Sequence, residues 1–126
     1  MRKYSRQREI ILEALRQVET HPSAAEIYDR AREKIPNISL GTVYRNLLNL
    51  QEDGEIQALF PGDGVERFDG NPMPHYHFYC RECACVSDVS IPISQELEKQ
   101  AEEALDAQID GYRLMLYGIC KHCRDK

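Results

Sequence analysis

The sequence predicts an α+β fold, with an N-terminal winged helix-turn-helix followed by a small α/β dimerisation domain that carries a structural zinc site. Three segments with helical periodicity and a strand–turn–strand pattern occupy residues 1–69, and two C-x-x-C pairs mark residues 75–126. A stretch containing Pro and Gly, residues 70–74, is typical of a linker. The chain has 126 residues, of which 29% are charged and 42% hydrophobic, a composition that suits one or two small globular domains.

Each of the three expected helices begins at a capping serine. Ser5 precedes the first apolar stripe, and Ser23 opens the capping box "SAAE". Pro36 ends the second helix because it cannot donate to the helical ladder. Ser39 precedes the third helix, which Gly54 ends. The residues expected on the inner faces are Ile10, Ile11, Ala14, Leu15 and Val18, then Ile27, Tyr28, Ala31 and Ile35, then Leu40, Val43, Leu47 and Leu50.

After the third helix, "EIQALF", "PGDG" and "VERFD" predict a β-hairpin that completes a winged helix. The outer face of the third helix is the candidate recognition surface, since its polar and aromatic side chains can reach base edges or phosphates. An ordinary helical domain with a polar face is the alternative, and the net charge of −5 weighs against a nucleic-acid partner. The basic N-terminus offsets that charge locally. The candidate DNA contacts are Arg2, Lys3, Arg6, Arg8, Thr42, Tyr44, Arg45 and Asn46.

The C-terminal half is expected to form a homodimer. Residues 94–108 read as a helix, and "GYRLMLYGIC" reads as a strand with apolar residues on both faces, which needs cover on both sides. Each half has fewer than 70 residues, too few for a robust core alone, so a metal and a second subunit are expected to stabilise it. No apolar run approaches the roughly 20 residues of a membrane span. No signal peptide is visible, so we expect a cytoplasmic protein.

Two cysteine pairs predict a structural zinc site. Cys80-x-x-Cys83 and Cys120-x-x-Cys123 supply four thiolates, which close a tetrahedral Zn²⁺ and leave no open position. Five cysteines without an export signal argue against a disulfide framework. A redox-active dithiol is the alternative, but no thioredoxin-like βαβ pattern accompanies the pairs. The fifth cysteine, Cys85, is expected to be a bystander.

Two histidines predict a second, regulatory metal site. His75 and His77 alternate along an expected strand and therefore face one side. The nearby cysteines are assigned to zinc, so the imidazoles need other partners, and Asp69 and Asp88 flank them. A mixed imidazole and carboxylate set suits Fe²⁺, Mn²⁺ or Zn²⁺. A pair of surface histidines on an exposed strand is the alternative.

The motifs "SRQREIILEAL", "HPSAAEIY", "ISLGTVYRNLLNL", "RFD", "HYHFYCREC" and "GYRLMLYGICKHC" follow one another along almost the whole chain. Together they resemble the ferric uptake regulator family. The resemblance implies a dimeric transcriptional repressor, closed by a metal corepressor onto palindromic double-stranded DNA. The peroxide-sensing branch binds its regulatory metal with three histidines and two aspartates, whereas iron-sensing members tend to carry glutamate at the acidic positions. The matching residues here favour the peroxide-sensing branch; they are His21, Asp69, His75, His77 and Asp88.

The resemblance also implies a mechanism. One ion held by residues of both domains would fix the separation of the recognition helices, and bound Fe²⁺ would react with H₂O₂ so that His21 or His75 gains oxygen and the DNA is released. Mn²⁺ would close the same clamp but respond poorly to peroxide. The sequence departs from the family pattern at Ala84, where a glycine is usual, and at the following Cys85. Arg113 lies near the place of a histidine that a second sensory site would need, so one regulatory site is expected.

Three other functions are alternatives to a peroxide-responsive repressor. An iron- or zinc-responsive uptake regulator of the same family, without peroxide chemistry, is the nearest. A zinc-ribbon adaptor that binds only protein is more remote. A zinc deaminase pairs H-x-E with P-C-x-x-C, but here the residue two after His75 is His77 and no proline precedes Cys80, so no enzyme activity is expected.

Overall fold

The computed structural model describes residues 5–18 and 20–126. The chain divides into two compact units, Met1–Pro72 and Met73–Lys126, which are called the first and second unit below. The division falls within residues 70–74. Among the described residues, no helix combines the length and apolar character needed to cross a bilayer.

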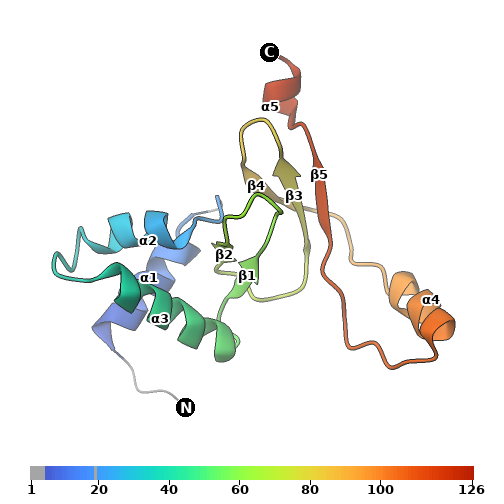
Figure 1. Ribbon diagram of the computed structural model, residues 1–126, viewed down its shortest axis with the longest axis horizontal. Helices are drawn as coiled ribbons and strands as arrows, with labels where there is room; N and C mark the ends of the chain where they lie inside the picture. Colours follow the sequence, from blue (N-terminus) through green and yellow to red (C-terminus); the bar gives the residue numbers. More distant parts are fainter. Residues whose placement is uncertain (1–4, 19) are drawn as a thin grey trace. The chain divides into compact units, whose positions relative to one another are not determined.

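The first unit is a three-helix bundle followed by a short hairpin (Figure 1). Its helices are α1 (Arg6–Arg16), α2 (Ala24–Ala31) and α3 (Leu40–Glu52), and its strands are β1 (Gln57–Leu59) and β2 (Arg67–Asp69). The two strands pair antiparallel, with Gln57 opposite Asp69. This arrangement confirms the expected winged helix-turn-helix.

The helix starts follow the capping chemistry of the sequence. Ser5 accepts a hydrogen bond from the Arg8 N–H at 3.1 Å, and Ser39 accepts one from the Thr42 N–H at 3.1 Å. At α2 the reciprocal capping box is complete, because the Ser23 hydroxyl and the carboxylate three residues later each accept from the other's backbone N–H. These caps satisfy backbone donors that each first helical turn leaves open.

The apolar stripes of the three helices meet in one core, and the hairpin contributes to it. Two of the expected inner residues lie outside this core. Val18 follows the end of α1, and Leu40, the first residue of α3, has 41% of its surface exposed. The largest fully buried side chains of this core are Ile11, Leu15, Ile27, Val43, Leu47 and Leu50.

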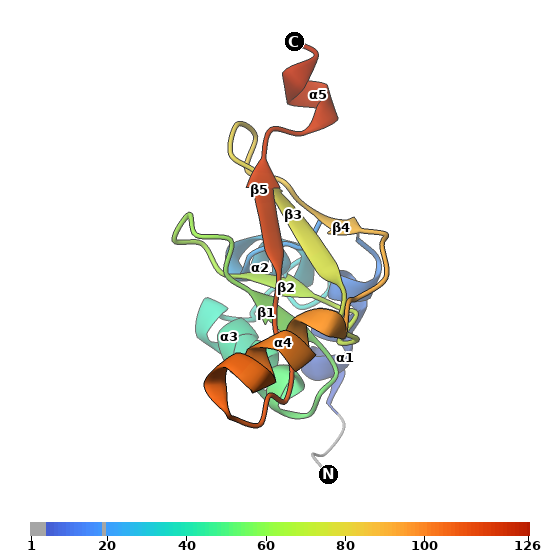
Figure 2. The same ribbon diagram turned by 90° about the vertical axis from the view of Figure 1, so that its right-hand side faces the viewer.

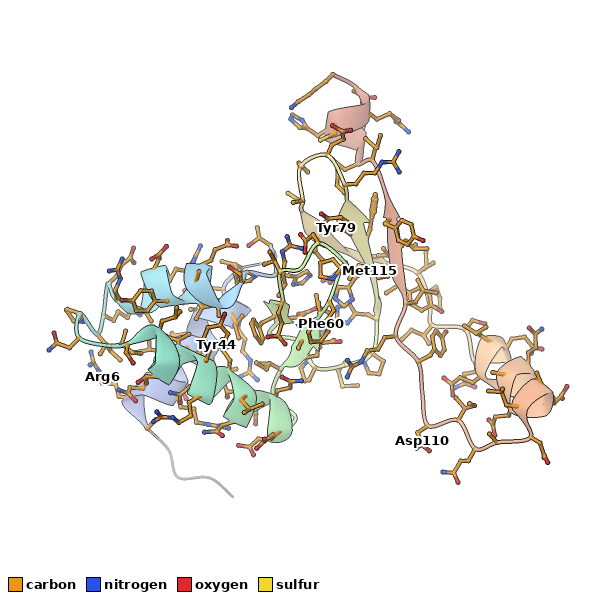
Figure 3. All side chains as sticks on the ribbon, in the orientation of Figure 1. Arg6, Tyr44, Phe60, Tyr79, Asp110 and Met115 are labelled. Atoms are coloured by element: carbon orange, nitrogen blue, oxygen red, sulfur yellow. The ribbon has the colours of Figure 1, made fainter. Side chains whose placement is uncertain are left out.

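The second unit contains a three-stranded sheet in the order β4–β3–β5 (Figure 2). The strands are β3 (Tyr76–Cys80), β4 (Val86–Val89) and β5 (Met115–Gly118). β3 pairs antiparallel with β4 and parallel with β5, which is therefore an edge strand. Figure 3 shows Tyr79 and Met115 on the neighbouring strands β3 and β5.

Two helices complete the second unit, α4 (Glu96–Leu105) and α5 (Lys121–Arg124). α4 is shorter than the helix expected over 94–108, because Asp106 adopts a left-handed conformation (φ 51°) that ends it. α4 buries none of its residues, and its apolar side remains exposed. The edge strand is also open, since Tyr117 is 77% exposed.

Candidate metal centres

The four cysteines of the two C-x-x-C pairs gather at one end of the second unit's sheet. Cys80 ends β3, and the residue opposite it, Gly118, ends β5. Because β3 and β5 run parallel, their carboxyl ends lie at the same end of the sheet. The two C-x-x-C pairs, which follow these ends, are therefore close together. The sulfur atoms all lie within 4.8 Å of one another; they belong to Cys80, Cys83, Cys120 and Cys123.

Backbone hydrogen bonds shape this cluster. The Cys120 N–H donates to Cys80 Sγ at 3.3 Å, and together with the N–H groups of Cys83 and Glu82 it lowers the pKa of the Cys80 thiol to about 6. The side-chain hydrogen bond between Cys123 and Cys120 instead raises the pKa of Cys123 to about 12. Four convergent sulfur atoms, one of them readily ionised, form a donor set that suits Zn²⁺ with no ligand position left open.

The first unit holds a buried histidine beside a buried aspartate. His21 Nδ1 lies 3.7 Å from Asp69 Oδ2, and both side chains are about 95% buried. Asp69 is the last residue of β2, and His21 lies in the loop before α2. Buried imidazole and carboxylate groups are costly unless they are paired or coordinate a metal, so His21 and Asp69 are candidate metal ligands.

The loop carrying His21 is fixed onto strand β2. The Phe68 N–H donates to the Pro22 carbonyl at 3.0 Å, and Ser23 forms an isolated β-bridge with Arg67. His21 itself has a φ of 52°, a conformation that costs a non-glycine residue free energy. The strain is tolerated because the flanking residues hold the loop in register beside Asp69.

The second unit holds a separate set of two histidines and one aspartate. Asp88 Oδ1 lies 2.9 Å from His75 Nε2 and 3.4 Å from His77 Nε2. His77 and Asp88 are opposite each other in the antiparallel β3–β4 register, and the two imidazole rings are 4.3 Å apart at their centroids. The sequence predicted that His75 and His77 face one side; the strand register adds Asp88 to that group, as the residue opposite His77.

The tautomer of His75 follows from a backbone contact. His75 Nδ1 lies 2.7 Å from the Met73 carbonyl, which can only accept, so Nδ1 carries a proton and donates it. Nε2 is then the nitrogen that faces Asp88. This is the arrangement that metal-binding histidines usually have, with one ring nitrogen held by a carbonyl and the other directed at the ligand position.

The residues predicted to contact DNA are spread over α1 and α3. Tyr44 and Arg45 are exposed on α3, and Thr42 and Asn46 are partly buried, with Asn46 Nδ2 donating to the Thr42 carbonyl at 2.9 Å. Arg6 is exposed and lies at the start of α1 (Figure 3).

The N-terminal candidates include one arginine that is engaged in an ion pair. Arg8 forms an ion pair with Asp53 at 3.1 Å and is 18% exposed. Arg2 and Lys3 lie outside the described residues.

The family model of the ferric uptake regulators matches residues 2–117 of the chain. The chain belongs to the ferric uptake regulator family. It is 39% identical over 120 residues to the peroxide-responsive repressor PerR of Staphylococcus aureus, an alignment that covers 95% of this chain and 81% of the relative.

Solved structures of the family show the same fold. The Campylobacter jejuni peroxide stress regulator is 28% identical, with a TM-score of 0.79 over 93% of this chain and 88% of that one. The Francisella tularensis ferric uptake regulator with iron is 25% identical, with a TM-score of 0.81 over 98% of this chain and 95% of that one.

Sequence reasoning missed residues that support the site without being ligands themselves. The carbonyls of Met73 and Pro22 are backbone groups, so the residue type does not indicate that they accept these hydrogen bonds. The sequence prediction assigns Gly70 and Asn71 to a linker, although Asp-Gly followed by Asn is typical of a tight turn. That composition was the available signal that the residues after Asp69 are structured.

Proposed function

We propose that this member of the ferric uptake regulator family is a metal-dependent DNA-binding repressor that responds to peroxide. The observation that carries the proposal is the presence of a preassembled histidine–aspartate set in each unit. The first is His21 with Asp69, and the second is His75 and His77 with Asp88. The similarity to PerR of S. aureus supports the peroxide response rather than iron or zinc sensing.

The regulatory ligands would be His21, Asp69, His75, His77 and Asp88, which together hold one Fe²⁺ or Mn²⁺. Three imidazoles and two carboxylates form a nitrogen–oxygen donor set of the kind these ions accept. Asp88 Oδ1 lies near Nε2 of both His75 and His77, so these three donor atoms would bind the same ion. The four thiolates would hold Zn²⁺, which stabilises the second unit and takes no part in sensing.

Metal binding would couple the two units, because each supplies part of the ligand set. With the ligands engaged, the DNA-reading units of a homodimer would be held at one separation. Half-sites of palindromic double-stranded DNA repeat at whole helical turns, so only a fixed separation fits both. The ion would bind this arrangement more tightly than one in which the two ligand sets are apart. That difference in binding free energy would favour the DNA-binding form.

The DNA contacts would come from the outer face of α3 and from the N-terminus. Tyr44 and Arg45 are the exposed members on α3, and Arg6 is the exposed cation at the start of α1. The remaining proposed contacts are Arg2, Lys3, Arg8, Thr42 and Asn46. A DNA-binding repressor of this kind would act in the cytoplasm.

The homodimer would form through the second unit, where apolar residues are exposed on α4 and β5. Leu97, Leu105, Leu116 and Tyr117 each have at least 45% of their surface exposed. An edge strand with open hydrogen-bonding groups and apolar neighbours is a surface that a second copy can cover.

Peroxide would end repression by altering a ligand histidine, His21 or His75. With Fe²⁺ bound, the site would be reactive toward H₂O₂. The imidazole would be oxidised by two electrons as one peroxide oxygen enters a ring C–H bond to give C–O–H, and the other peroxide oxygen would leave as water. The modified ring is a poorer ligand, so the two ligand sets separate and DNA affinity is lost.

The test is peptide mass spectrometry of Fe²⁺-loaded protein treated with H₂O₂, alongside DNA binding measured with Fe²⁺, Mn²⁺ and Zn²⁺. We expect a gain of one oxygen on the peptide containing His21 or His75, together with loss of DNA binding in the Fe²⁺ sample only. Oxidation confined to methionine and cysteine, with DNA binding intact, would favour the alternative of an iron- or zinc-responsive uptake regulator. Failure to bind any DNA at low salt would favour a protein-binding adaptor.

A further inference from the structure

We propose that Gln57, Gly70 and Asn71 are positioning residues that orient Asp69 and thereby set the affinity of the regulatory site without touching the ion. The inference rests on the proposed function, because it takes Asp69 as a ligand. All of the contacts that carry it lie within the first unit.

In the first contact, the two oxygens of the Asp69 carboxylate have different partners. The Asn71 N–H donates to Oδ1 at 2.9 Å, which closes an Asx turn, while Oδ2 is the oxygen 3.7 Å from His21 Nδ1. A glutamate is one methylene longer and cannot close this turn. The turn therefore gives a structural reason for an aspartate at this position.

The second contact comes from the opposite strand. Gln57 lies across from Asp69 in the β1–β2 register, and its Nε2 donates to the Asn71 carbonyl at 2.8 Å. Asn71 is thus held through its N–H by Asp69 and through its carbonyl by Gln57. A carbonyl can only accept, so this contact requires the amide nitrogen and not the oxygen of Gln57.

The third contact explains the glycine between them. A Cβ at Gly70 would lie 3.1 Å from Arg16 Cγ, 3.2 Å from the Arg16 backbone nitrogen and 3.2 Å from the Leu15 carbonyl carbon. The last two atoms belong to the backbone of α1, which would have to shift by a few tenths of an ångström to accept a methyl group. Glycine lets the turn lie this close to the end of α1 without that shift, so the contact with α1 helps to hold the turn and the carboxylate that closes it.

Orientation of this kind is worth a measurable part of metal affinity. A ligand already held in its binding orientation loses less conformational freedom on coordination. Loss of a partner that orients a metal ligand typically costs about 10-fold to 100-fold in affinity. The turn thus makes β1 and α1, which supply no ligand, part of the regulatory device.

The test measures Mn²⁺ affinity of zinc-loaded full-length protein by electron paramagnetic resonance for Gln57→Glu and Gly70→Ala. Glutamate keeps the size of Gln57 but has no N–H to donate, so we expect Mn²⁺ affinity to fall by about tenfold or more. Gln7→Glu adds the same charge at an exposed site of the first unit, and Gly111→Ala adds a methyl where nothing lies within 4 Å. Both controls should bind Mn²⁺ as the parent does.

A double-mutant cycle separates orientation of Asp69 from general destabilisation. In an Asp69→Ala background there is no carboxylate to orient, so Gln57→Glu should change Mn²⁺ affinity by less than about twofold. An equal loss in both backgrounds, or no loss in the parent, overturns the positioning role. Should Asp69→Ala itself leave Mn²⁺ affinity unchanged, the proposed regulatory site fails, and the positioning role fails with it. Gln57→Glu alone carries this test if Gly70→Ala loosens the first unit.

Discussion

Asp88 directs one carboxylate oxygen at two imidazoles, lying 2.9 Å from His75 Nε2 and 3.4 Å from His77 Nε2. The strand register accounts for this, because His77 and Asp88 are opposite residues of an antiparallel pair and His75 precedes the strand by one residue. A single acidic group thus organises the second unit's share of the proposed regulatory site.

Removing that carboxylate should disable metal binding. Asp88→Ala leaves both imidazoles without their shared acidic partner, so we expect Mn²⁺ affinity to fall by at least about 100-fold, more than the loss of an orienting group would cause. Isothermal titration with Mn²⁺ measures it. Asp110→Ala removes an exposed carboxylate from the same unit and should leave the affinity unchanged. Parent-like affinity in Asp88→Ala would exclude Asp88 as a ligand.

The cysteine cluster should be needed for the second unit to fold. Cys83→Ser removes one of four sulfur donors, and the binding free energy of structural zinc, about 10–16 kcal/mol, is also folding free energy. We expect loss of bound zinc and collapse of the amide NMR dispersion of residues 73–126. The matched control is Cys85→Ser, an exposed cysteine outside the cluster, which should retain zinc. A folded second unit in zinc-free Cys83→Ser would contradict a structural role.

Ala84 should be a site of avoidable strain. It has a φ of 63° in the turn between Cys83 and β4, where a left-handed conformation costs a residue with a Cβ about 1–2 kcal/mol. Ala84→Gly relieves this but gains chain entropy when unfolded, so we expect a net stabilisation of about 0.5–1 kcal/mol. Urea unfolding at saturating zinc measures it. Ala101→Gly, in the interior of α4, should instead destabilise by a similar amount.

The open edge strand should be the dimer contact. Leu116→Glu places a charge on β5 at a residue that is 45% exposed in the single chain, and burial of that charge should weaken dimerisation by at least about tenfold. Sedimentation velocity across a concentration series measures the dissociation constant. Val65→Glu introduces the same charge on the hairpin at 44% exposure and should leave the dimer intact. Equal effects of both variants would argue against a β5 interface.

Arg45 should contribute one phosphate or base contact from α3. Arg45→Ala removes an exposed cation from the proposed recognition face, so we expect weaker operator binding and a salt slope reduced by roughly one unit. Fluorescence anisotropy over a range of salt concentrations measures the slope. Arg30→Ala removes an exposed cation from α2, outside the proposed DNA-contacting surface, and should leave the slope unchanged. An unchanged slope in Arg45→Ala would move the DNA contact elsewhere.

Local chemistry explains why much of the fold could be read from the sequence. Capping serines such as Ser5 and Ser39 act on backbone groups two or three residues away, and apolar periodicity records which helix face is buried. Each C-x-x-C pair is equally local, because its two cysteines are three residues apart and lie on the same turn. Expectations failed where the end of an element decided the outcome, as at Leu40, which is exposed, and Asp106, where α4 stops early.

The sequence by itself determined the elements, the four sulfur donors and the identity of the candidate nitrogen and oxygen ligands. Only the tertiary structure decided how those ligands are held. The parallel pairing of β3 with β5 joins cysteines forty positions apart, the β3–β4 register places Asp88 opposite His77, and Gly70, next to Asp69, lies close to the end of α1. The physical reason is that these relationships depend on strand register and on van der Waals contact between distant segments, which no short stretch of sequence encodes.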